Sequence, residues 1–379
     1  MRDVYFDNAS TTRVDEYIAD LARDIMLNRY GNPSSLHAKG LEAQRETEQA
    51  AAGILKALGA GGGRVIFTSG GTEANNLALF GTVQAKKRLG NRIVTTEIEH
   101  PSVLAATKEL ERQGFEMTLI PCGADGRFDM EKLANACDEK TILVSMMLVN
   151  NETGAVQPVE KASAEIRRRS PNAAIHTDAI QAFGKIPLSP KKLGVDMISV
   201  SGHKIHAPKG VGALWLAKGV RVMPMLFGGG QQEALRPGTE NVPLFAALGA
   251  AAKTSVGELS ENSGKVLKAR ETLLKELLAM EGISLNSPGE DCSPYILNIS
   301  ADGLKSETVI NFMAERGVYI SGGSACSKGK NSYVLKAMGL SDRRINCALR
   351  ISLSKYSTEE DARYFCEVLS QARQSLRKF

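Results

Sequence analysis

The chain has 379 residues, of which 43% are hydrophobic and 23% are charged, close to the average of soluble globular proteins. This composition excludes a disordered or collagen-like chain, and the length suggests about two domains with at least one large core. The formal net charge of +5 arises from 47 Lys and Arg against 42 Asp and Glu, so we expect no obligate nucleic-acid partner.

Neither a membrane span nor a metal site is expected. The longest apolar stretch, Val242 to Ala252, falls well short of the ~20 residues that cross a bilayer. The N-terminal residues include two acids and no apolar segment, so we expect no export signal and a cytoplasmic location. The six cysteines form no Cys-x-x-Cys pair, which predicts neither a disulfide framework nor a zinc site.

Short β-branched runs alternate with amphipathic stretches between residues 64 and 200, which predicts a mainly parallel sheet with helices on both faces. A long helix is expected first, over Leu36–Leu58. The expected strands are Arg64–Thr68, Arg92–Thr96, Glu116–Pro121, Thr141–Val149, Ala173–Thr177 and Met197–Val200, and helices between them include Glu73–Leu89, Val103–Gln113 and Val159–Arg169.

A second unit is expected after one long helix from Leu244 to about Met280. Strands at Tyr295–Ile299, Val318–Ile320 and Ala348–Leu353 and helices at Ser306–Arg316 and Glu359–Arg377 predict a small α+β domain there. We therefore expect a large domain over residues 15–255, a small C-terminal domain over 256–379, and an N-terminal segment, 1–14, that packs with the small domain.

Polar clusters follow five of the expected strands. In an open α/β sheet, ligands bind beyond the carboxyl ends of the strands, so these clusters predict one site. They are Ser69–Glu73, Glu97–His100, Asn150–Glu152, Asp178 with Gln181, and Ser201–Lys204.

The first cluster joins a strand to a helix through Gly70, Gly71 and Thr72. Free backbone N–H groups at a helix start favour an anion, so the segment is interpreted as a phosphate cradle. Taken alone, it is more often an ordinary glycine-rich turn with a threonine cap. The other four clusters favour the cradle.

Lys204 follows an apolar strand and stands near His203 and His206. Desolvation and cationic neighbours lower the pKa of a lysine, and such a lysine can form a Schiff base, although a strand-end lysine is more often solvated. Asp178 could balance a buried cation or cap the following turn. A phosphate cradle, an imine-forming lysine and an acid for a ring nitrogen together match what pyridoxal phosphate requires.

Several longer stretches agree in order and spacing with one family over nearly the whole chain. The sequence resembles the cysteine desulfurases of the NifS/IscS type, among the class V aminotransferase-like pyridoxal phosphate enzymes. The matching stretches are Tyr5–Thr12, Gly31–Ser35, Thr68–Asn76, Glu99–Ser102, Val149–Glu152, His176–Gln181, Ser201–Lys204, Arg236–Asn241 and Ser324–Ser327.

The resemblance implies a fold-type I pyridoxal phosphate-dependent transferase with a seven-stranded-type, mainly parallel sheet. It implies that Lys204 carries the cofactor and that Asp178 pairs with its ring nitrogen. It further implies phosphate contacts from Gly71, Thr72, Ser201 and His203, a ring-hydroxyl contact from Gln181, ring stacking and proton movement by His100, and a place for Asn151 between cofactor and substrate carboxylate.

The resemblance also implies an obligate homodimer, because Thr239 would reach the phosphate in the neighbouring subunit. Arg350 would clamp the substrate α-carboxylate, for which a guanidinium fork is suited. Seen alone, Arg350 is more typical of a surface strand. The implied reaction removes sulfur from L-cysteine, leaving L-alanine and a persulfide that passes to an acceptor protein such as an iron–sulfur scaffold.

Cys326 differs from the other five cysteines in its small, polar and basic surroundings, which include Lys328 and Lys330. They predict an exposed loop whose cations favour thiolate, so Cys326 is the expected sulfur acceptor. Cys137, Cys347 and Cys366 are interpreted as buried thiols, and Cys122 and Cys292 are undecided.

Two other functions remain open at this point. An aminotransferase or selenocysteine lyase would use the same scaffold, and only the Cys326 loop favours desulfuration over these. A catalytically silent scaffold that binds sulfur-trafficking proteins is the alternative from another class, and the presence of Lys204, Asp178 and Arg350 argues against it.

Overall fold

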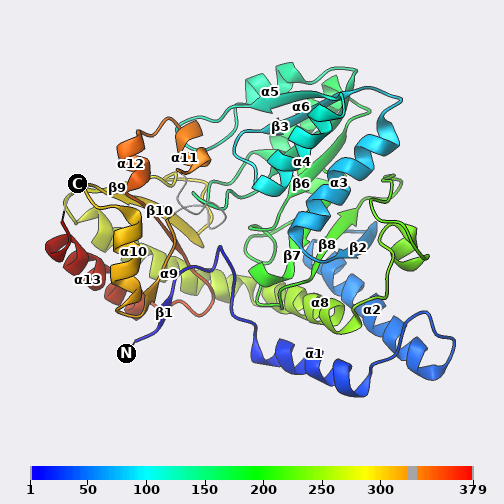
Figure 1. Cartoon of the computed structure of the whole chain (residues 1–379), viewed down its shortest axis with the longest axis horizontal. Coiled ribbons are helices and arrows are strands. Elements are labelled where there is room, and N and C mark those ends of the chain that lie inside the picture. The colour runs from blue at the N-terminus through cyan, green and yellow to red at the C-terminus, as the bar shows by residue number, and fades with distance from the viewer. Residues whose placement is uncertain (1, 323–330, 378–379) are drawn as a thin grey trace.

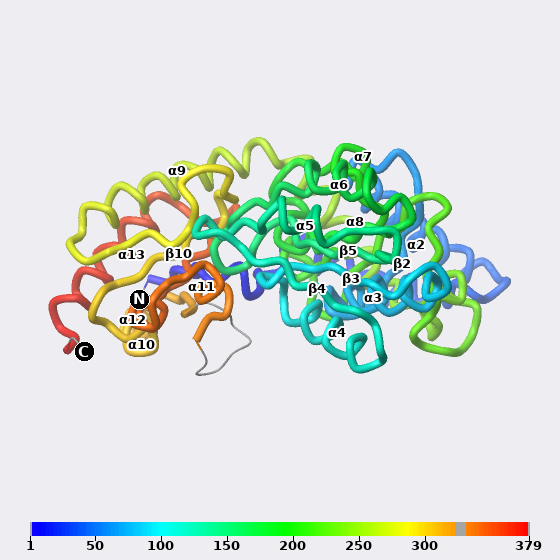
Figure 2. Tube along the Cα trace, turned by 90° about the horizontal axis from the view of Figure 1, so that it is seen from above, coloured from blue at the N-terminus to red at the C-terminus, as the bar shows by residue number. Residues whose placement is uncertain are grey.

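The computed structural model describes residues 2–322 and 331–377. A seven-stranded sheet between helices forms the larger part of the molecule, and a small sheet with its own helices lies beside it (Figure 1, Figure 2). Within the described ranges, no helix has both the length and the apolar character needed to cross a bilayer.

The large sheet has the strand order β2-β8-β7-β6-β5-β3-β4. β8 runs antiparallel to both β2 and β7, and the remaining pairs are parallel. β2 therefore points the same way as β3 to β7, and these six strands end at one edge. The strands are β2 (Arg64–Thr68), β3 (Arg92–Thr96), β4 (Glu116–Ile120), β5 (Thr141–Met147), β6 (Ala174–Asp178), β7 (Met197–Ser201) and β8 (Gly212–Leu216).

Consecutive residues of each large-sheet strand point to opposite faces, as the pleat requires. Ile66 and Ile93 belong to one apolar cluster with helices α3 (Gly71–Lys86) and α4 (Pro101–Arg112). Phe67 belongs to a second cluster on the other face, with helices from both halves of the chain. Those helices are α2 (Ala38–Ala57), α5 (Met130–Ala136), α6 (Val159–Arg169) and α8 (Val242–Gly257), while α1 (Glu16–Asn28) packs on α8 and α7 (Pro190–Leu193) on α6.

The small sheet is antiparallel, with the order β12-β10-β9, and a separate parallel pair joins β1 to β11. The strands are β1 (Val4–Tyr5), β9 (Ile283–Leu285), β10 (Ile296–Ala301), β11 (Val318–Tyr319) and β12 (Ala348–Ser352). The helices of this part are α9 (Leu259–Leu278), α10 (Ser306–Ala314), α11 (Tyr333–Ala337), α12 (Asp342–Asn346) and α13 (Glu359–Ser375).

The fold-type I architecture expected from the sequence is confirmed, but the single long helix is wrong and one strand of the large sheet was not expected. The long helix from Leu244 is two helices joined at Glu258, just after Gly257, a poor helix former. β8 was not expected, because its Gly-Ala-Leu-Trp-Leu run lacks β-branched residues and is a strand only through pairing on both sides. β11 pairs with β1, and Ser321, which follows β11, forms an isolated bridge with Arg350 of β12.

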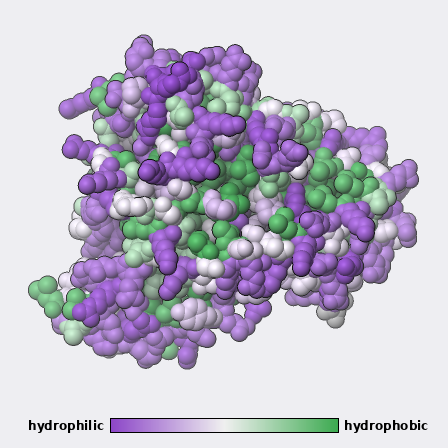
Figure 3. Space-filling view, turned by 180° about the vertical axis from the view of Figure 1, so that it is seen from behind, coloured by the Kyte–Doolittle hydropathy of each residue, from purple (hydrophilic) through white to green (hydrophobic). Residues whose placement is uncertain are grey.

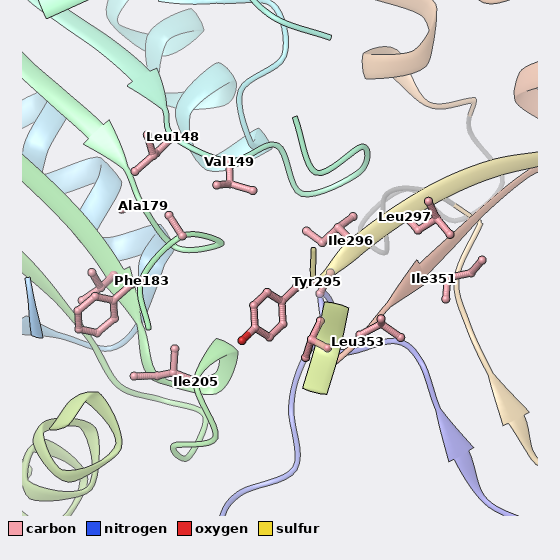
Figure 4. Packing of buried hydrophobic residues seen from close by; sticks show 14 of the residues in the cluster. Leu148, Val149, Ala179, Phe183, Ile205, Tyr295, Ile296, Leu297, Ile351 and Leu353 are labelled. Atoms are coloured by element: carbon pink, nitrogen blue, oxygen red, sulfur yellow. The ribbon is translucent and has the colours of Figure 1, made fainter. Parts of the chain in front are cut away.

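One apolar cluster joins the large sheet to the small one. Figure 4 shows Phe183 and Ile205 on the large-sheet side of this cluster, and Tyr295, Ile351 and Leu353 on the small-sheet side. Closely packed interiors resist relative movement of the elements that they join. The residues that follow β7 and those on β12 are therefore held at a fixed separation.

Candidate active site

A cavity of about 270 Å³ opens at the carboxyl edge of the large sheet. Most of the sequence-predicted site residues meet there: Gly71, Thr72, His100, Asn151, Asp178, Gln181, Ser201, His203, Lys204 and Arg350 line it. Thr239 lies in an exposed segment and does not line this cavity. Cys326 lies outside the described residues.

The large-sheet residues converge because each one stands where a parallel strand ends. Asp178 is the last residue of β6, and Lys204 ends a short 3₁₀ turn that begins directly after β7. His100 caps the N-terminus of α4, where its ring accepts a hydrogen bond from the Ser102 N–H. Gly71 and Thr72 open α3, so the N–H groups of the first turn face the cavity end of the sheet.

Lys204 contacts the N-terminal segment of the chain. Its Nζ donates hydrogen bonds to the carbonyl oxygens of Ala9, at 2.6 Å, and Ser10, at 2.7 Å. The segment reaches this place because β1 pairs with β11 and Asn8 Nδ2 donates to the Ser352 carbonyl. The lysine amine is thus held at the cavity by neutral acceptors.

A second lysine lies beneath the cavity. Lys185 is buried and donates to Gln181 Oε1 at 3.0 Å, while Gln181 Nε2 donates to the Ala9 carbonyl at 2.9 Å. Burial, and then the positive charges of Lys204 and Arg350, lower the pKa of Lys185 to about 7. Lys185 therefore fixes which end of the Gln181 amide faces the N-terminal segment.

The two cavity histidines are disposed to be neutral near pH 7. Burial, followed by the positive charges of Lys204 and Lys209, lowers the pKa of His203 to about 4. Burial is also the main cause that lowers the pKa of His100. Each ring can therefore donate one hydrogen bond from a neutral imidazole.

Arg350 is 1% exposed, so the alternative of a surface strand residue is wrong. Its Nη2 donates to Asp7 Oδ1 at 2.9 Å and to Ser10 Oγ at 2.6 Å, and its Nη1 donates to the Asn151 carbonyl at 3.1 Å. Its Nε is buried and has no hydrogen-bond partner among the described residues. Contacts with Asp7 and Ser10 of the N-terminal segment thus hold the guanidinium, which lines the cavity.

Glu99 is a buried acid behind the cavity. Its Oε1 accepts hydrogen bonds from Thr96 Oγ1 at 2.6 Å and from the Met147 N–H at 2.8 Å. Burial raises the pKa of Glu99 to about 8, and the two hydrogen bonds only partly offset this. Near pH 7 the native protein therefore holds a proton on Glu99 that the unfolded chain releases.

We compare the unfolding free energies of Glu99→Gln and wild type at different pH values. The mutant value minus the wild-type value should increase as the pH rises from about 4.5 to about 8. In this range the native wild type binds a proton that the unfolded chain lacks, so wild-type stability falls as pH rises, whereas glutamine does not titrate. The change should be on the order of a few kcal/mol. Urea unfolding at several pH values measures it, with the partly exposed Glu97→Gln as control. A flat difference would contradict the expectation.

The cysteines that the structure describes are unreactive by their surroundings. Cys137, Cys347 and Cys366 are buried, as expected from the sequence. Cys122 and Cys292 are partly buried, and burial raises the pKa of both, to about 11 for Cys122. Burial thus opposes thiolate formation at these thiols, and at Cys292 it outweighs the hydrogen bond that Arg270 Nη2 donates to Sγ at 3.5 Å.

The seven-stranded sheet with one reversed strand, and its pocket at the carboxyl edge, has the architecture of the fold-type I pyridoxal phosphate enzymes. A solved structure titled "NIFS-LIKE PROTEIN" is 37% identical and covers 99% of this chain and 100% of its own, with a TM-score of 0.94. Another, "SspA in complex with cysteine", is 32% identical, with a TM-score of 0.81, and covers 94% and 100%.

The model of the class-V aminotransferase family matches residues 4–365, and the chain belongs to this family. Its curated relatives include "Cysteine desulfurase IscS 1" of Archaeoglobus fulgidus, which is 38% identical over 98% of this chain and 97% of the relative. "Cysteine desulfurase IscS" of Methanosarcina thermophila is also 38% identical, over 99% of this chain and 93% of the relative.

Sequence reasoning missed three residues that support the cavity: Asp7, Asn75 and Lys185. Asp7 and Asn75 lie inside stretches that match the family, and Glu99 lies in the expected strand-end cluster Glu97–His100, but no role was assigned to any of these three. Asn75 lies one turn into α3 and Lys185 lies after the Asp178 turn, so neither directly follows a strand. A buried polar residue on an apolar helix face is the signal that could have identified Asn75.

Proposed function

We propose that this protein is a cysteine desulfurase that uses pyridoxal phosphate to convert L-cysteine to L-alanine and a persulfide on Cys326. The observation that carries the proposal is that Lys204, Asp178 and Arg350 meet in one cavity, in a chain whose full-length relatives are named cysteine desulfurases. The persulfide would then pass to an acceptor protein such as an iron–sulfur scaffold.

The cavity residues fit the cofactor. Ser201 Oγ and Asn151 Oδ1 are buried without a hydrogen-bond partner among the described residues, as expected where a polar ligand supplies the partner. A Cβ on Gly71 would lie 2.1 Å from Ile180 Cδ1, so a larger residue at this helix start would have to displace the Ile180 side chain. Gly71, Thr72, Ser201 and His203 would hold the phosphate.

When bound, pyridoxal phosphate supplies an aldehyde for imine formation and an electron-withdrawing ring. Lys204 would hold the cofactor and then move the substrate α-proton, since its amine already lies at the cavity. Asp178, 5% exposed, would pair with the ring nitrogen, and Gln181 would donate to the ring hydroxyl. His100 would cover the ring, and Asn151 would lie between it and the substrate carboxylate.

The sulfur transfer would take place at Cys326. Its thiolate would attack the substrate sulfur, so that the S–S bond forms while the bond between sulfur and the substrate β-carbon breaks. The departing carbon takes one proton and leaves as L-alanine, and the sulfur remains on the protein as a persulfide. The basic residues beside Cys326 in the sequence support a thiolate, as do the unfavourable surroundings of the other five cysteines.

A homodimer is part of the proposal. Exposed apolar side chains, including Tyr30 and Phe227, lie on α1, on the connection from α1 to α2, and on the segment before Thr239. These three segments lie in the part of the molecule away from the small sheet (Figures 1 and 2). Figure 3 shows that hydrophobic side chains on the back face gather in patches. Arg236 ties the Thr239 segment to Glu73 at 2.9 Å, near the helix start proposed to hold phosphate. A second copy of this chain would cover such surfaces.

We retain the division into residues 1–14, 15–255 and 256–379 as a proposal. The pairing of β1 with β11 and the ion pairs of Arg2 with Glu360 and Asp361 support the assignment of the first segment to the small domain.

The proposed function is tested with purified protein, pyridoxal phosphate, L-cysteine and a thiol reductant. We expect L-alanine and sulfide in equal amounts. Formation of a keto acid without sulfide would instead indicate an aminotransferase, and release of selenide from selenocysteine with no reaction of cysteine would indicate a selenocysteine lyase. A protein that binds no cofactor and forms no product would be the silent scaffold.

Replacing Arg350 by alanine should weaken substrate binding by on the order of 2 to 5 kcal/mol, because it removes a buried partner of the α-carboxylate. Arg350→Lys should rescue poorly, since lysine lacks the fork and cannot keep the contacts with Asp7, Ser10 and Asn151. Titration of the cofactor absorbance with L-cysteine measures this binding, and thermal unfolding controls for lost stability. Wild-type substrate affinity in a folded Arg350→Ala protein would contradict the assignment.

A further inference from the structure

Asn75 links two parts of the cavity that are far apart in the sequence. It lies on α3, is completely buried, and donates from Nδ2 to Asp178 Oδ2 at 2.7 Å and to Ser102 Oγ at 2.8 Å. Asp178 ends β6 and Ser102 lies in the first turn of α4. One amide nitrogen thus uses both of its protons on these two groups.

The orientation of the Asn75 amide follows from what its neighbours can accept. Turning the amide over would place Oδ1 against the Asp178 carboxylate, which also accepts the Ile180 N–H at 2.9 Å, and two acceptors would then face each other. Asn75 Oδ1 is buried without a partner among the described residues. The side chain therefore gives up one hydrogen bond and keeps both donors directed at Asp178 and Ser102.

The direction of the next hydrogen bond is fixed by the backbone, because the Ser102 N–H can only donate to His100 Nδ1, which must therefore be an acceptor. Ser102 Oγ accepts from Asn75, so its single proton is available for His100 Nδ1, which lies 2.8 Å away. The Ser102 N–H also donates to the same ring nitrogen, at 3.1 Å. Because Nδ1 accepts from both groups, the proton of the neutral imidazole lies on Nε2.

We propose that Asn75 is a positioning residue that orders this chain of donors, so that Asp178 remains an acceptor and His100 is held in the Nε2–H form. In this form His100 can donate a hydrogen bond from Nε2 to a group in the cavity, and Nε2 cannot accept one there until the tautomer changes. Among the charged groups nearby, Asp178 favours protonation of His100, while Lys204 opposes it. The catalytic meaning of this order rests on the proposed function, but the hydrogen-bond order concerns the protein's own residues.

The tautomer is measured in the wild-type holoenzyme with ¹⁵N-labelled histidine. The chain has five histidines, and loss of one signal set in His100→Gln identifies His100. At pH 7.5 we expect long-range ¹H–¹⁵N spectra to show protonated Nε2 and unprotonated Nδ1. A proton on Nδ1 would overturn the proposal. This measurement does not depend on turnover, so it separates failure of the proposal from failure of the proposed function.

Asn75→Asp tests the direction of the chain. The new carboxyl would share a proton with Asp178, which it would face at the place of the present 2.7 Å contact, and its other oxygen would accept the Ser102 proton. This removes that donor from Nδ1, so the titration midpoint of His100 should rise. Asn76→Asp adds the same charge one residue along α3 but contacts neither Asp178 nor Ser102 Oγ, so its shift should be much smaller. Equal shifts in the two variants would overturn the proposal. If Asn75→Asp does not fold, the wild-type tautomer alone decides.

Discussion

Lys204→Ala is expected to lose cysteine desulfuration to background while still binding pyridoxal phosphate non-covalently. The substitution removes the amine proposed to bind the cofactor and to move the α-proton, whereas the proposed phosphate contacts Gly71, Thr72, Ser201 and His203 would remain. General acid–base catalysis alone is worth roughly 10²- to 10⁴-fold, and the loss of the covalent link adds to this. Alanine formation measures turnover, and gel filtration followed by absorbance measures retained cofactor.

The site of attachment is checked independently of turnover. Borohydride reduction of the wild-type holoenzyme, followed by peptide mapping, should find the cofactor on Lys204. The exposed Lys209, five residues further on, supplies the matched control, because Lys209→Ala should keep both activity and the labelled peptide. Labelling of the buried Lys185 or of Lys209 would show that the wrong lysine has been assigned.

Cys326→Ser is expected to keep the cofactor absorbance and its response to added L-cysteine, while sulfide and persulfide production fall to near background. Lys204, Asp178 and Arg350 are unchanged, so binding should persist, but serine cannot accept sulfur. In the sequence, Lys328 and Lys330 lie close to Cys326, and we expect their charges to favour its thiolate.

Two partly buried cysteines provide the controls for Cys326. Cys122→Ser and Cys292→Ser should desulfurate cysteine at close to the wild-type rate, because burial raises the pKa of both thiols. Tryptic mapping after a brief cysteine pulse, with alkylation of the persulfide, should find the label on Cys326. A label on Cys122 or Cys292, or full desulfuration by Cys326→Ser, would refute the assignment.

The predicted role of Gln181 depends on a contact that the sequence did not indicate. Lys185 donates to its Oε1, so its Nε2 is the end available to donate toward the N-terminal segment and the cavity. Lys185 is buried and forms no ion pair with an acid among the described residues, which is costly for a charged amine, so its place beneath the cavity supports a functional use. The strand-end rule finds Gln181, while only the packed structure finds the residue that orients it.

The sequence by itself determined six of the seven strands of the large sheet, the edge of the sheet where the site lies and most residues of the cavity. The periodicity of a strand and the polar residues that follow it are local properties of the sequence. Because parallel strands all end at one edge of a sheet, the residues that follow them meet at that edge. This is why Asp178 and Lys204 were correctly expected to meet.

Only the tertiary structure decided how the cavity is closed and which of its donors face which acceptors. Arg350 and Asp7 are 343 residues apart, and their contact exists because β12 and the N-terminal segment pack together. In the same way, Asn75 joins Asp178 to Ser102 only after α3, α4 and β6 are packed. Such contacts depend on the path of the whole chain and on the few hydrogen-bond partners that a buried site offers. Local sequence patterns contain no information on either.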